Sequence, residues 1–324
     1  MIEQLVKQLQ KSKNPVIFSH IRPDGDAIGS QVAMSLWFKN QGIEAVAVNE
    51  DDVPPNMTWL SDLFPIQKPT QDILDQADAF IFVDGSAAYR FGDWGVKANE
   101  MESVPSYVID HHPDTSDEFD LAYAVVSASS TCELLYRVFE ATDLNLIDND
   151  AARAMYTGLV TDTGSFRFDS VSAEVHDIVA DLLRRGNFRP NVVHEELYDR
   201  RTQKQLHLLG EVLKSIELFN DGKIAAMRIT QKMLDDHNSA YSDTDGFIAY
   251  PLSLNGVDSA FIASEKEGKI KLSLRSKRLI KANEWAKAFG GGGHARAAGC
   301  WHDSDDMDEA IEAVVAKGIE LMEE

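Results

Sequence analysis

Short apolar runs alternate with longer, more polar segments through the first half of the chain. Each run is short enough for a buried strand, and most of the following segments are long enough for a helix or a crossover loop. Strand, crossover and strand in this order build a parallel sheet. The pattern predicts an α/β fold with a five-stranded, mainly parallel sheet. The expected strands are 16–18, 43–48, 79–83, a run ending at Asp110, and 121–126, with helices over 1–12, 27–40, 148–161 and 172–186.

The pattern changes after residue 213. Two pairs of strand-like segments are each joined by a short polar turn, one over 220–223 and the other over 265–268. Helical stretches lie between and after them, including an acidic tail over 304–324. This alternation predicts a smaller, mostly antiparallel α+β domain. We expect a first domain over 1–188, a helical connector over 189–213 and a second domain over 214–324.

Length, composition and charge narrow the class of protein. The chain of 324 residues is longer than one ordinary core fills, and its apolar fraction of 44% is normal for a globular protein. It has two cysteines, no secretory signal pattern and no apolar run near the roughly 20 residues that cross a bilayer. We therefore expect a cytoplasmic protein without a membrane partner. The net charge of −22 opposes binding of long nucleic acid, but it allows a small phosphorylated ligand in a local basic pocket.

Acidic and imidazole side chains stand at the ends of predicted elements in four places. They are His20, Asp24 and Asp26 in one loop, then Asp84, then Asp110, His111 and His112, and finally Asp162. Because the carboxyl ends of parallel strands share one edge of a sheet, we expect these side chains to meet there. Imidazole and carboxylate groups in such a cluster can hold divalent metal ions.

Each of these places also has an ordinary structural interpretation. Asp24 or Asp26 can cap the following helix, Asp84 lies in an Asp-Gly turn, and Asp162 stands at a helix end close to a glycine. Capping accounts for one aspartate, but not for His20 as well. Four segments that bring ligand-type side chains to one edge favour a metal site over four unrelated turns.

These four motifs, in this order, resemble those of the DHH phosphoesterase superfamily. The resemblance implies a Rossmann-like DHH catalytic domain that binds two Mn²⁺ ions, with Mg²⁺ as an alternative. The implied ligands are His20, Asp24 and Asp84 for one ion, and Asp26, Asp84, His111 and Asp162 for the other. Mixed nitrogen and oxygen ligands suit Mn²⁺ better than Mg²⁺. On this mapping the catalytic residues are His112, which donates to a phosphoryl or leaving-group oxygen, and Asp110, which orients an imidazole.

A glycine-rich segment in the second half predicts phosphate binding. Four glycines at 290–293 run into His294 and Arg296, followed by small residues that favour the start of a helix. Exposed backbone N–H groups at such a start bind anions, although a flexible linker is the alternative. Arg275 stands at the end of a predicted strand, whereas most of the basic residues around it are expected on a solvated edge.

The glycine run resembles the GGGGH signature of the DHHA1 domain, and the two halves together resemble the NrnA-type group of DHH–DHHA1 proteins. This resemblance covers nearly the whole chain. It implies a Mn²⁺-dependent phosphoesterase that degrades very short oligoribonucleotides to mononucleotides. It also implies dephosphorylation of 3′-phosphoadenosine 5′-phosphate (pAp) to AMP, both by two-metal hydroxide attack on phosphorus. The residues implied to bind the substrate are Arg275, Gly291, Gly292, Gly293, His294 and Arg296.

Two other interpretations of the sequence stay open. The same chemistry could act on linear or cyclic dinucleotides, on polyphosphate or on pyrophosphate. The chain could also be a nucleotide-binding module without catalysis, although every position implied to hold metal carries a competent side chain. Short RNA and pAp are the expected partners and long nucleic acid is not. A homodimer is compatible with the sequence but not indicated by it.

Overall fold

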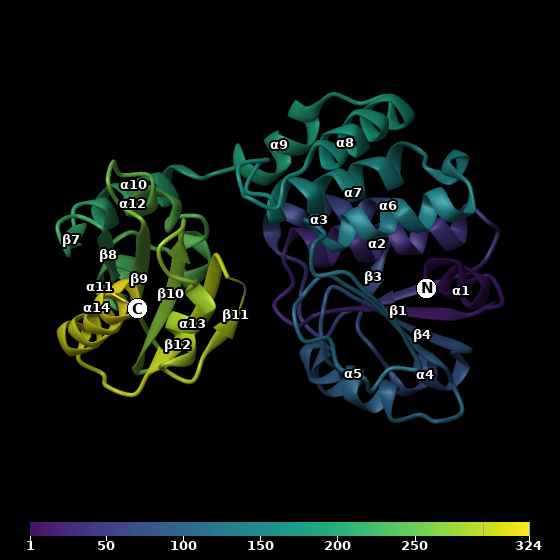
Figure 1. Cartoon of the computed structure of the whole chain (residues 1–324), viewed down its shortest axis with the longest axis horizontal. Helices are drawn as coiled ribbons and strands as arrows, with labels where there is room; N and C mark the ends of the chain where they lie inside the picture. The colour runs from purple at the N-terminus through teal and green to yellow at the C-terminus, as the bar shows by residue number, and fades with distance from the viewer. Residues whose placement is uncertain (294, 324) are drawn as a thin grey trace. The chain divides into compact units, whose positions relative to one another are not determined.

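The computed structural model describes residues 1–293 and 295–323, and it divides into two compact units, Met1–Arg200 and Arg201–Glu324 (Figure 1). The division lies in the stretch expected as a connector. Two helices occupy that stretch, α9 (Pro190–Tyr198) and α10 (Gln203–Leu213), so the helical run is interrupted between them. Thr202 caps the N-terminus of α10. Its hydroxyl accepts a hydrogen bond from the N–H of Gln205, and the Gln205 side chain accepts one from the N–H of Thr202.

The sheet of the first unit has six parallel strands among the described residues, in the order β3-β2-β1-β4-β5-β6. The α/β class predicted from the sequence is confirmed, but the expected count of five strands is one too few. The additional strand, β3, has two residues and is too short to produce an apolar pattern. The strands are β1 (Pro15–Ser19), β2 (Val46–Val48), β3 (Ile66–Gln67), β4 (Ala79–Val83), β5 (Ser106–Asp110) and β6 (Leu121–Ala124).

Helices cover both faces of this sheet (Figure 1). Alternate residues of β1 face the two layers: Ile17 belongs to the core beneath α1, α2, α6 and α7, whereas Val16 and Phe18 belong to the core beneath α4 and α5. The helices are α1 (Ile2–Leu9), α2 (Gly25–Lys39), α3 (Thr58–Leu63), α4 (Gln71–Gln76), α5 (Gly92–Asn99), α6 (Thr131–Thr142), α7 (Asn149–Asp162) and α8 (Ala173–Gly186).

Two glycines let α7 pack closely against α2. A Cβ atom on Gly29 of α2 would lie 2.6 Å from the carbonyl oxygen of Ala154. A Cβ atom on Gly158 of α7 would lie 2.3 Å from Oδ1 of Asp26. No side chain fits at such distances, so glycine is required for the two helices to approach this closely. The contact places the start of α2, and with it Asp26, against the middle of α7.

The second unit contains a mixed sheet, which within residues 201–293 and 295–323 has six strands in the order β11-β12-β10-β9-β8-β7. Neighbouring strands are antiparallel except for β8 and β9, as the sequence predicted for a mostly antiparallel α+β domain. The strands are β7 (Glu217–Phe219), β8 (Ile224–Ile229), β9 (Ser259–Lys266), β10 (Lys269–Ser276), β11 (Gly292–Gly293) and β12 (Ala297–His302). The remaining helices are α11 (Gln231–Asp236), α12 (Ala249–Leu252), α13 (Ala282–Lys287) and α14 (Met307–Glu323).

The glycine run does not open a helix, and this part of the sequence prediction is wrong. Gly290 has φ +70° and ends α13, because the N–H groups of Gly290 and Gly291 donate to the carbonyls of Lys287 and Ala286. The chain then forms β11 and β12, and β12 pairs along β10. The small residues serve close packing instead: a Cβ on Gly291 would lie 2.3 Å from the carbonyl oxygen of Gly299.

Strand β10 separates two layers of the second unit. Leu272 and Leu274 face a core shared with α13 and α14 that contains the buried Trp285. On the opposite face, α10 and α11 cover β8 and β9. Along β10 that opposite face is only half-buried, at Lys271 and Ser273 among others. The β10 part of the sheet therefore keeps one partly exposed side.

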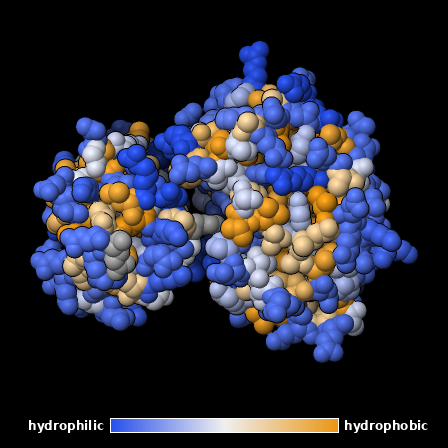
Figure 2. Space-filling model, in the orientation of Figure 1, coloured by the Kyte–Doolittle hydropathy of each residue, from blue (hydrophilic) through white to orange (hydrophobic). Residues whose placement is uncertain are grey.

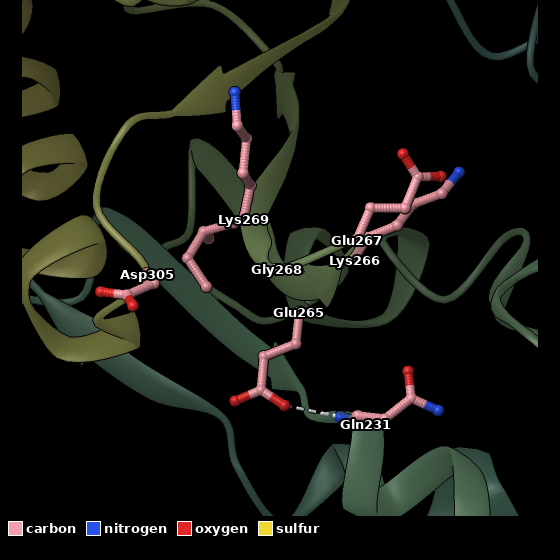
Figure 3. Close-up of a pocket in the computed structure, with 8 residues that line it drawn as sticks. Gln231, Glu265, Lys266, Glu267, Gly268, Lys269 and Asp305 are labelled. Atoms are coloured by element: carbon pink, nitrogen blue, oxygen red, sulfur yellow. Dashed lines mark hydrogen bonds between the residues drawn. The ribbon is translucent and has the colours of Figure 1, made fainter.

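A cavity of about 310 Å³ borders the turn between β9 and β10 (Figure 3). Both signs of charge line it, and Oε2 of Glu265 accepts from the backbone N–H of Gln231 at 2.7 Å. The lining includes Lys269, at the opposite end of β10 from Arg275. This cavity is therefore distinct from the part of the sheet that carries Arg275.

Hydrophilic residues cover much of the visible surface of each unit, and apolar residues gather in the middle of the visible face of the first unit (Figure 2). This agrees with a chain that has 53 acidic and 31 basic residues. No helix in the described part of the chain is both long enough and apolar enough to span a membrane.

Candidate active site

The acidic and imidazole residues singled out in the first unit lie together beside the carboxyl ends of its central strands. β1 ends directly before His20, β4 ends directly before Asp84, and Asp110 is the last residue of β5. These three strands are neighbours in the sheet, so the loops that follow them converge. The other members come from helices, Asp24 and Asp26 from the start of α2 and Asp162 from the end of α7.

Three overlapping groups of described residues have ligand atoms within 4.8 Å of one another, close enough to hold a metal ion. They are His20, Asp24 and Asp84; Asp26, His111 and Asp162; and Asp84, His111 and His112. Oδ2 of Asp84 lies 3.4 Å from Nε2 of His20, and Oδ1 of Asp84 lies 3.6 Å from Nε2 of His111. The two oxygens of Asp84 thus face two different imidazoles, which is the arrangement that a bridging carboxylate needs.

The charge of this donor set fits divalent cations. Four aspartates contribute to the groups, and together they carry −4 when ionised, which balances the +4 of two divalent cations. Asp26 and Asp84 are buried, with 0% and 2% of their surface exposed. Buried carboxylates in such numbers are costly without compensating positive charge. Two bound cations would supply that charge.

Backbone carbonyls set the tautomer of both candidate ligand histidines. Nδ1 of His20 lies 2.9 Å from the carbonyl oxygen of Ile21, and Nδ1 of His111 lies 3.3 Å from that of Ala128. A carbonyl oxygen can only accept, so Nδ1 carries the proton and Nε2 of the neutral ring keeps a lone pair. In both rings Nε2 is the atom near the aspartates, as coordination of a metal ion requires.

Two helix N-termini stabilise negative charge in the cluster. Asp24 caps α2, because its Oδ1 accepts from the N–H groups of Asp26 and Ala27, each at 3.1 Å. The Asp26 carboxylate accepts from the N–H groups of Thr131 at 2.6 Å and Cys132 at 2.9 Å, in the first turn of α6. The capping interpretation of Asp24 is thus correct. It is compatible with a ligand role, because a carboxylate offers about four lone pairs.

Asp84 adopts a left-handed backbone conformation with φ +64°. Such a conformation costs of order 1–3 kcal/mol, less for aspartate than for most residues, and it is frequent at functional sites. Oδ1 of Asp84 also accepts from Oγ1 of Thr131 at 2.9 Å. Sequence reasoning missed Thr131, and the signal that could have found it was its place directly after the capping Ser130 of α6.

Burial and neighbouring charges shift the pKa values of the cluster. Burial lowers the pKa of His20, but Asp84 and Asp24 outweigh it and raise that pKa to about 9. Burial and the nearby carboxylates raise the pKa of Asp162 to about 6, although His111 acts to lower it. Burial also acts to raise the pKa of Asp84, but its hydrogen bond with His20 and the surrounding imidazoles hold that pKa well below its usual range.

These shifts predict that metal binding releases protons. Near pH 7 the metal-free site holds a proton on His20, with its pKa of about 9, and an ion can bind Nε2 only when that proton leaves. Metal affinity should therefore rise with pH up to about 9, by about tenfold per unit for each proton released. In the metal-free protein, protonation of His20 adds to the free energy of unfolding. This contribution is complete below pH 6.5, and it is lost as the pH rises through about 9, the pKa of His20 in the folded protein.

Calorimetric titration with Mn²⁺ in two buffers of different protonation enthalpy measures the number of protons released. We expect at least about one proton per chain at pH 7. An affinity that does not change with pH, together with no proton release, would contradict the placement of His20 at the metal.

A buried aspartate holds His112. Nδ1 of His112 donates to Oδ1 of Asp110 at 2.7 Å, and Oδ2 of Asp110 accepts from Oγ1 of Thr115 at 2.9 Å. These two bonds fix the carboxylate and the ring together, so Nε2 of His112 is the ring nitrogen that can act on a bound group. Nδ1 of His112 also lies 3.8 Å from Oδ1 of Asp84, so the ring stands at the border of the candidate metal site. Thr115 was not identified from the sequence.

The candidate substrate residues of the second unit gather at one end of its sheet. Arg275 borders a cavity of about 90 Å³ that is also lined by hydroxyl-bearing residues, among them Ser273 and Thr244. The carbonyl of Arg296 accepts from the N–H of Ser276 at 3.2 Å, which brings the segments of Arg275 and Arg296 side by side. Gly292 and Gly293 are exposed in β11, whereas the N–H of Gly291 donates to the carbonyl of Ala286 in α13. His294 lies outside the described residues.

Comparison with known families identifies both units. The model of the DHH family, N-terminal domain, matches residues 14–159, and the model of the DHHA1 domain matches residues 222–317. The chain belongs to the DHH–DHHA1 family. The first match contains every candidate metal ligand except Asp162, and the second contains Arg275 and Arg296. Family membership together with the cluster around Asp84 makes the chain a metal-dependent phosphoesterase.

Relatives of this DHH–DHHA1 protein match it over most of its length, which confirms the resemblance inferred from the sequence. A Streptococcus mutans protein named probable bifunctional oligoribonuclease and PAP phosphatase NrnA is 28% identical over 292 residues, 88% of each chain. A Thermus thermophilus protein, named bifunctional oligoribonuclease and PAP phosphatase NrnA, is 29% identical over 319 residues, 96% of this chain and 92% of the relative. The crystal structure of an exopolyphosphatase-related protein from Bacteroides fragilis is 26% identical with a TM-score of 0.93, covering 100% of this chain and 97% of that one.

Proposed function

We propose that this DHH–DHHA1 protein is a Mn²⁺-dependent hydrolase of very short oligoribonucleotides and of pAp, with mononucleotides and AMP as products. The observation that carries the proposal is that the two oxygens of Asp84 face His20 and His111, which belong to two different ligand groups. The names of the Streptococcus and Thermus relatives support the choice of substrates. The mixed imidazole and carboxylate donors favour Mn²⁺ over Mg²⁺.

The residues of the first unit have separable tasks in this proposal. Divalent ions in the cluster would supply an activated water and would neutralise charge on the phosphoryl oxygens. His112 donates through Nε2 to a phosphoryl or leaving-group oxygen, and Asp110 keeps the ring in the orientation for that donation. Thr115 holds Asp110, so the imidazole is positioned before a substrate arrives.

The second unit supplies the phosphate contacts in this proposal. Arg275 is half-buried at the end of β10, beside a cavity with several hydroxyl groups. A guanidinium in such a place can form paired, charge-assisted hydrogen bonds to a phosphate. Arg296 lies on the adjoining segment and adds a second positive charge. The helix N-terminus expected at the glycine run is absent from the described residues, so these side chains carry the anion recognition.

A substrate panel tests the proposed function. We expect Mn²⁺-dependent release of mononucleotide from a 5′-phosphorylated RNA dinucleotide and of phosphate from pAp, with a steep fall for long RNA. The fall follows from the net charge of −22, which repels long polyanions while the local arginines attract short ones. Equal rates per chain end on dinucleotide and long RNA would contradict the proposed substrate range.

The same panel separates the other candidate functions. A linear or cyclic dinucleotide, polyphosphate or pyrophosphate hydrolysed much faster than RNA and pAp would reassign the substrate while keeping the chemistry. Similarity to the exopolyphosphatase-related protein from Bacteroides fragilis is a reason to include polyphosphate. Nucleotide binding without turnover of any member, in Mn²⁺-loaded protein, would indicate a binding module.

A further inference from the structure

One face of the β10–β12 pair carries a row of side chains that the metal chemistry does not use. Residues 271, 273 and 275 of β10 alternate with the buried Leu272 and Leu274, and they lie half-buried on the side away from α13 and α14. In the antiparallel register Lys271 is opposite Trp301 and Ser273 is opposite Gly299. Arg275, Lys271 and Trp301 therefore lie on the same face of the sheet.

Lys271 and Trp301 are in direct contact. Nζ of Lys271 lies over the indole, 5.2 Å from its centroid, which is a cation–π distance. Gly299 leaves room for this contact, because a Cβ there would lie only 3.2 Å from Nζ of Lys271. The lysine thus crosses β12 above a residue that has no side chain. Trp301 is half-buried, so the residue keeps some exposed surface.

A second lysine–tryptophan contact in the chain provides a comparison. Nζ of Lys97 lies 4.9 Å from the ring centroid of Trp94, but these residues are three apart on the single helix α5. The contact of Lys271 with Trp301 instead joins two strands, next to an arginine and a cavity. A cross-strand pair of this kind can simply stabilise the sheet, so the experiment must separate that role from ligand binding.

We propose that Trp301 and Lys271 form a subsite for a second nucleotide, in which the base stacks on the indole and the ammonium contacts a phosphate. The proposal rests on the proposed function, because it takes Arg275 as the contact for the first phosphate. The Cα atoms of Lys271 and Arg275 are four residues apart on one strand, or about 13 Å, and both side chains are long enough to reach toward neighbouring phosphates of one dinucleotide. A partly exposed aromatic ring beside a cation is a combination that binds single-stranded nucleotides without base preference.

This subsite distinguishes between the two proposed substrates. A dinucleotide has a second base to place on Trp301, whereas pAp has a single nucleoside. Loss of the indole should therefore weaken the dinucleotide alone. A purely structural role in the sheet would affect both substrates equally and would lower the thermal stability.

The test compares Trp301→Leu with Trp301→Phe in the full-length, Mn²⁺-loaded protein. Trp301→Leu should raise KM for a 5′-phosphorylated dinucleotide about tenfold and leave KM for pAp unchanged. Trp301→Phe, which keeps an aromatic face, should restore most of the loss. The matched control is Trp94→Leu, which removes the other lysine-contacting indole and should change neither substrate.

Lys271→Gln tests the phosphate contact independently. The slope of log affinity for the dinucleotide against log salt concentration should fall by about 0.7, the value for one phosphate contact on a single strand. An unchanged KM for the dinucleotide in Trp301→Leu, or equal losses on dinucleotide and pAp, would overturn the subsite.

If the proposed function is wrong, the experiments give a different result from the one expected if only the subsite is wrong. If the wild-type protein hydrolyses neither substrate, equilibrium dialysis with the same dinucleotide still tests the subsite. Weaker binding by Trp301→Leu than by wild type supports it, and equal binding overturns it.

Discussion

Replacing Asp84 by asparagine is expected to empty the cluster of both metal ions and to lower turnover by about 10³-fold or more. The reason is the position of its carboxylate, with Oδ2 3.4 Å from Nε2 of His20 and Oδ1 3.6 Å from Nε2 of His111. Asparagine tolerates the left-handed conformation at this position, where φ is +64°, so the change removes charge without adding strain. Metal analysis after gel filtration, together with pAp hydrolysis, measures both effects.

Asp114→Asn is the matched control for this prediction. Asp114 lies in the loop after β5, is exposed, and also has a positive φ, of +62°. The same chemical change there should leave metal content and turnover unaltered. His112→Ala provides the complementary result, with slow turnover but both ions retained. Two ions retained in Asp84→Asn would show that this carboxylate does not bridge.

Replacing Arg275 by alanine is expected to lower kcat/KM on nucleotides by about ten- to hundredfold while the metal content stays unchanged. The loss corresponds to one charge-assisted, paired hydrogen bond of about 1.5–3 kcal/mol. Arg275 lies in the second unit, which contributes no residue to the described ligand groups of the metal cluster. A small aryl phosphodiester without a second phosphate should therefore be hydrolysed at an almost unchanged rate.

Two further variants define the role of the guanidinium. Arg275→Lys keeps the charge but cannot form the paired hydrogen bonds, and it should recover only part of the activity. Lys269→Ala removes a positive charge at the opposite end of the same strand and should have little effect. Equal damage to nucleotide and aryl phosphodiester hydrolysis by Arg275→Ala, or loss of metal, would exclude a substrate-binding role.

The fold class could be predicted because its main signals are local. Apolar runs over 16–18 and 79–83 mark β1 and β4, and the caps of α6, α7 and α8 are visible as Ser130, Asp148 and Ser172. Strand β3 could not be predicted, since two residues carry no periodicity and form a strand only by pairing with β2. The glycine run was misinterpreted because Gly290 can either end one helix or precede another, and the pairing of β12 with β10 decides between them.

The candidate metal site could be predicted for a different reason. Every proposed ligand stands at an element boundary, and parallel topology brings such boundaries to one edge, so His20, Asp84 and Asp162 could be grouped without knowing distances. Thr115 could not be found in this way, and Thr131 was missed although it stands at the start of α6. Threonine hydroxyls are common at turns, and only the fold brings Oγ1 of Thr131 to 2.9 Å from Asp84.

Titration of the metal-free protein with Mn²⁺, with bound ions and pAp hydrolysis followed in the same samples, tests the central claim most directly. One ligand group of His20, Asp24 and Asp84 and another of Asp26, His111 and Asp162 predict two ions per chain, and they predict that activity rises with the second ion rather than with the first. Saturation at one ion per chain with full activity, or full activity with no bound metal, would contradict this assignment.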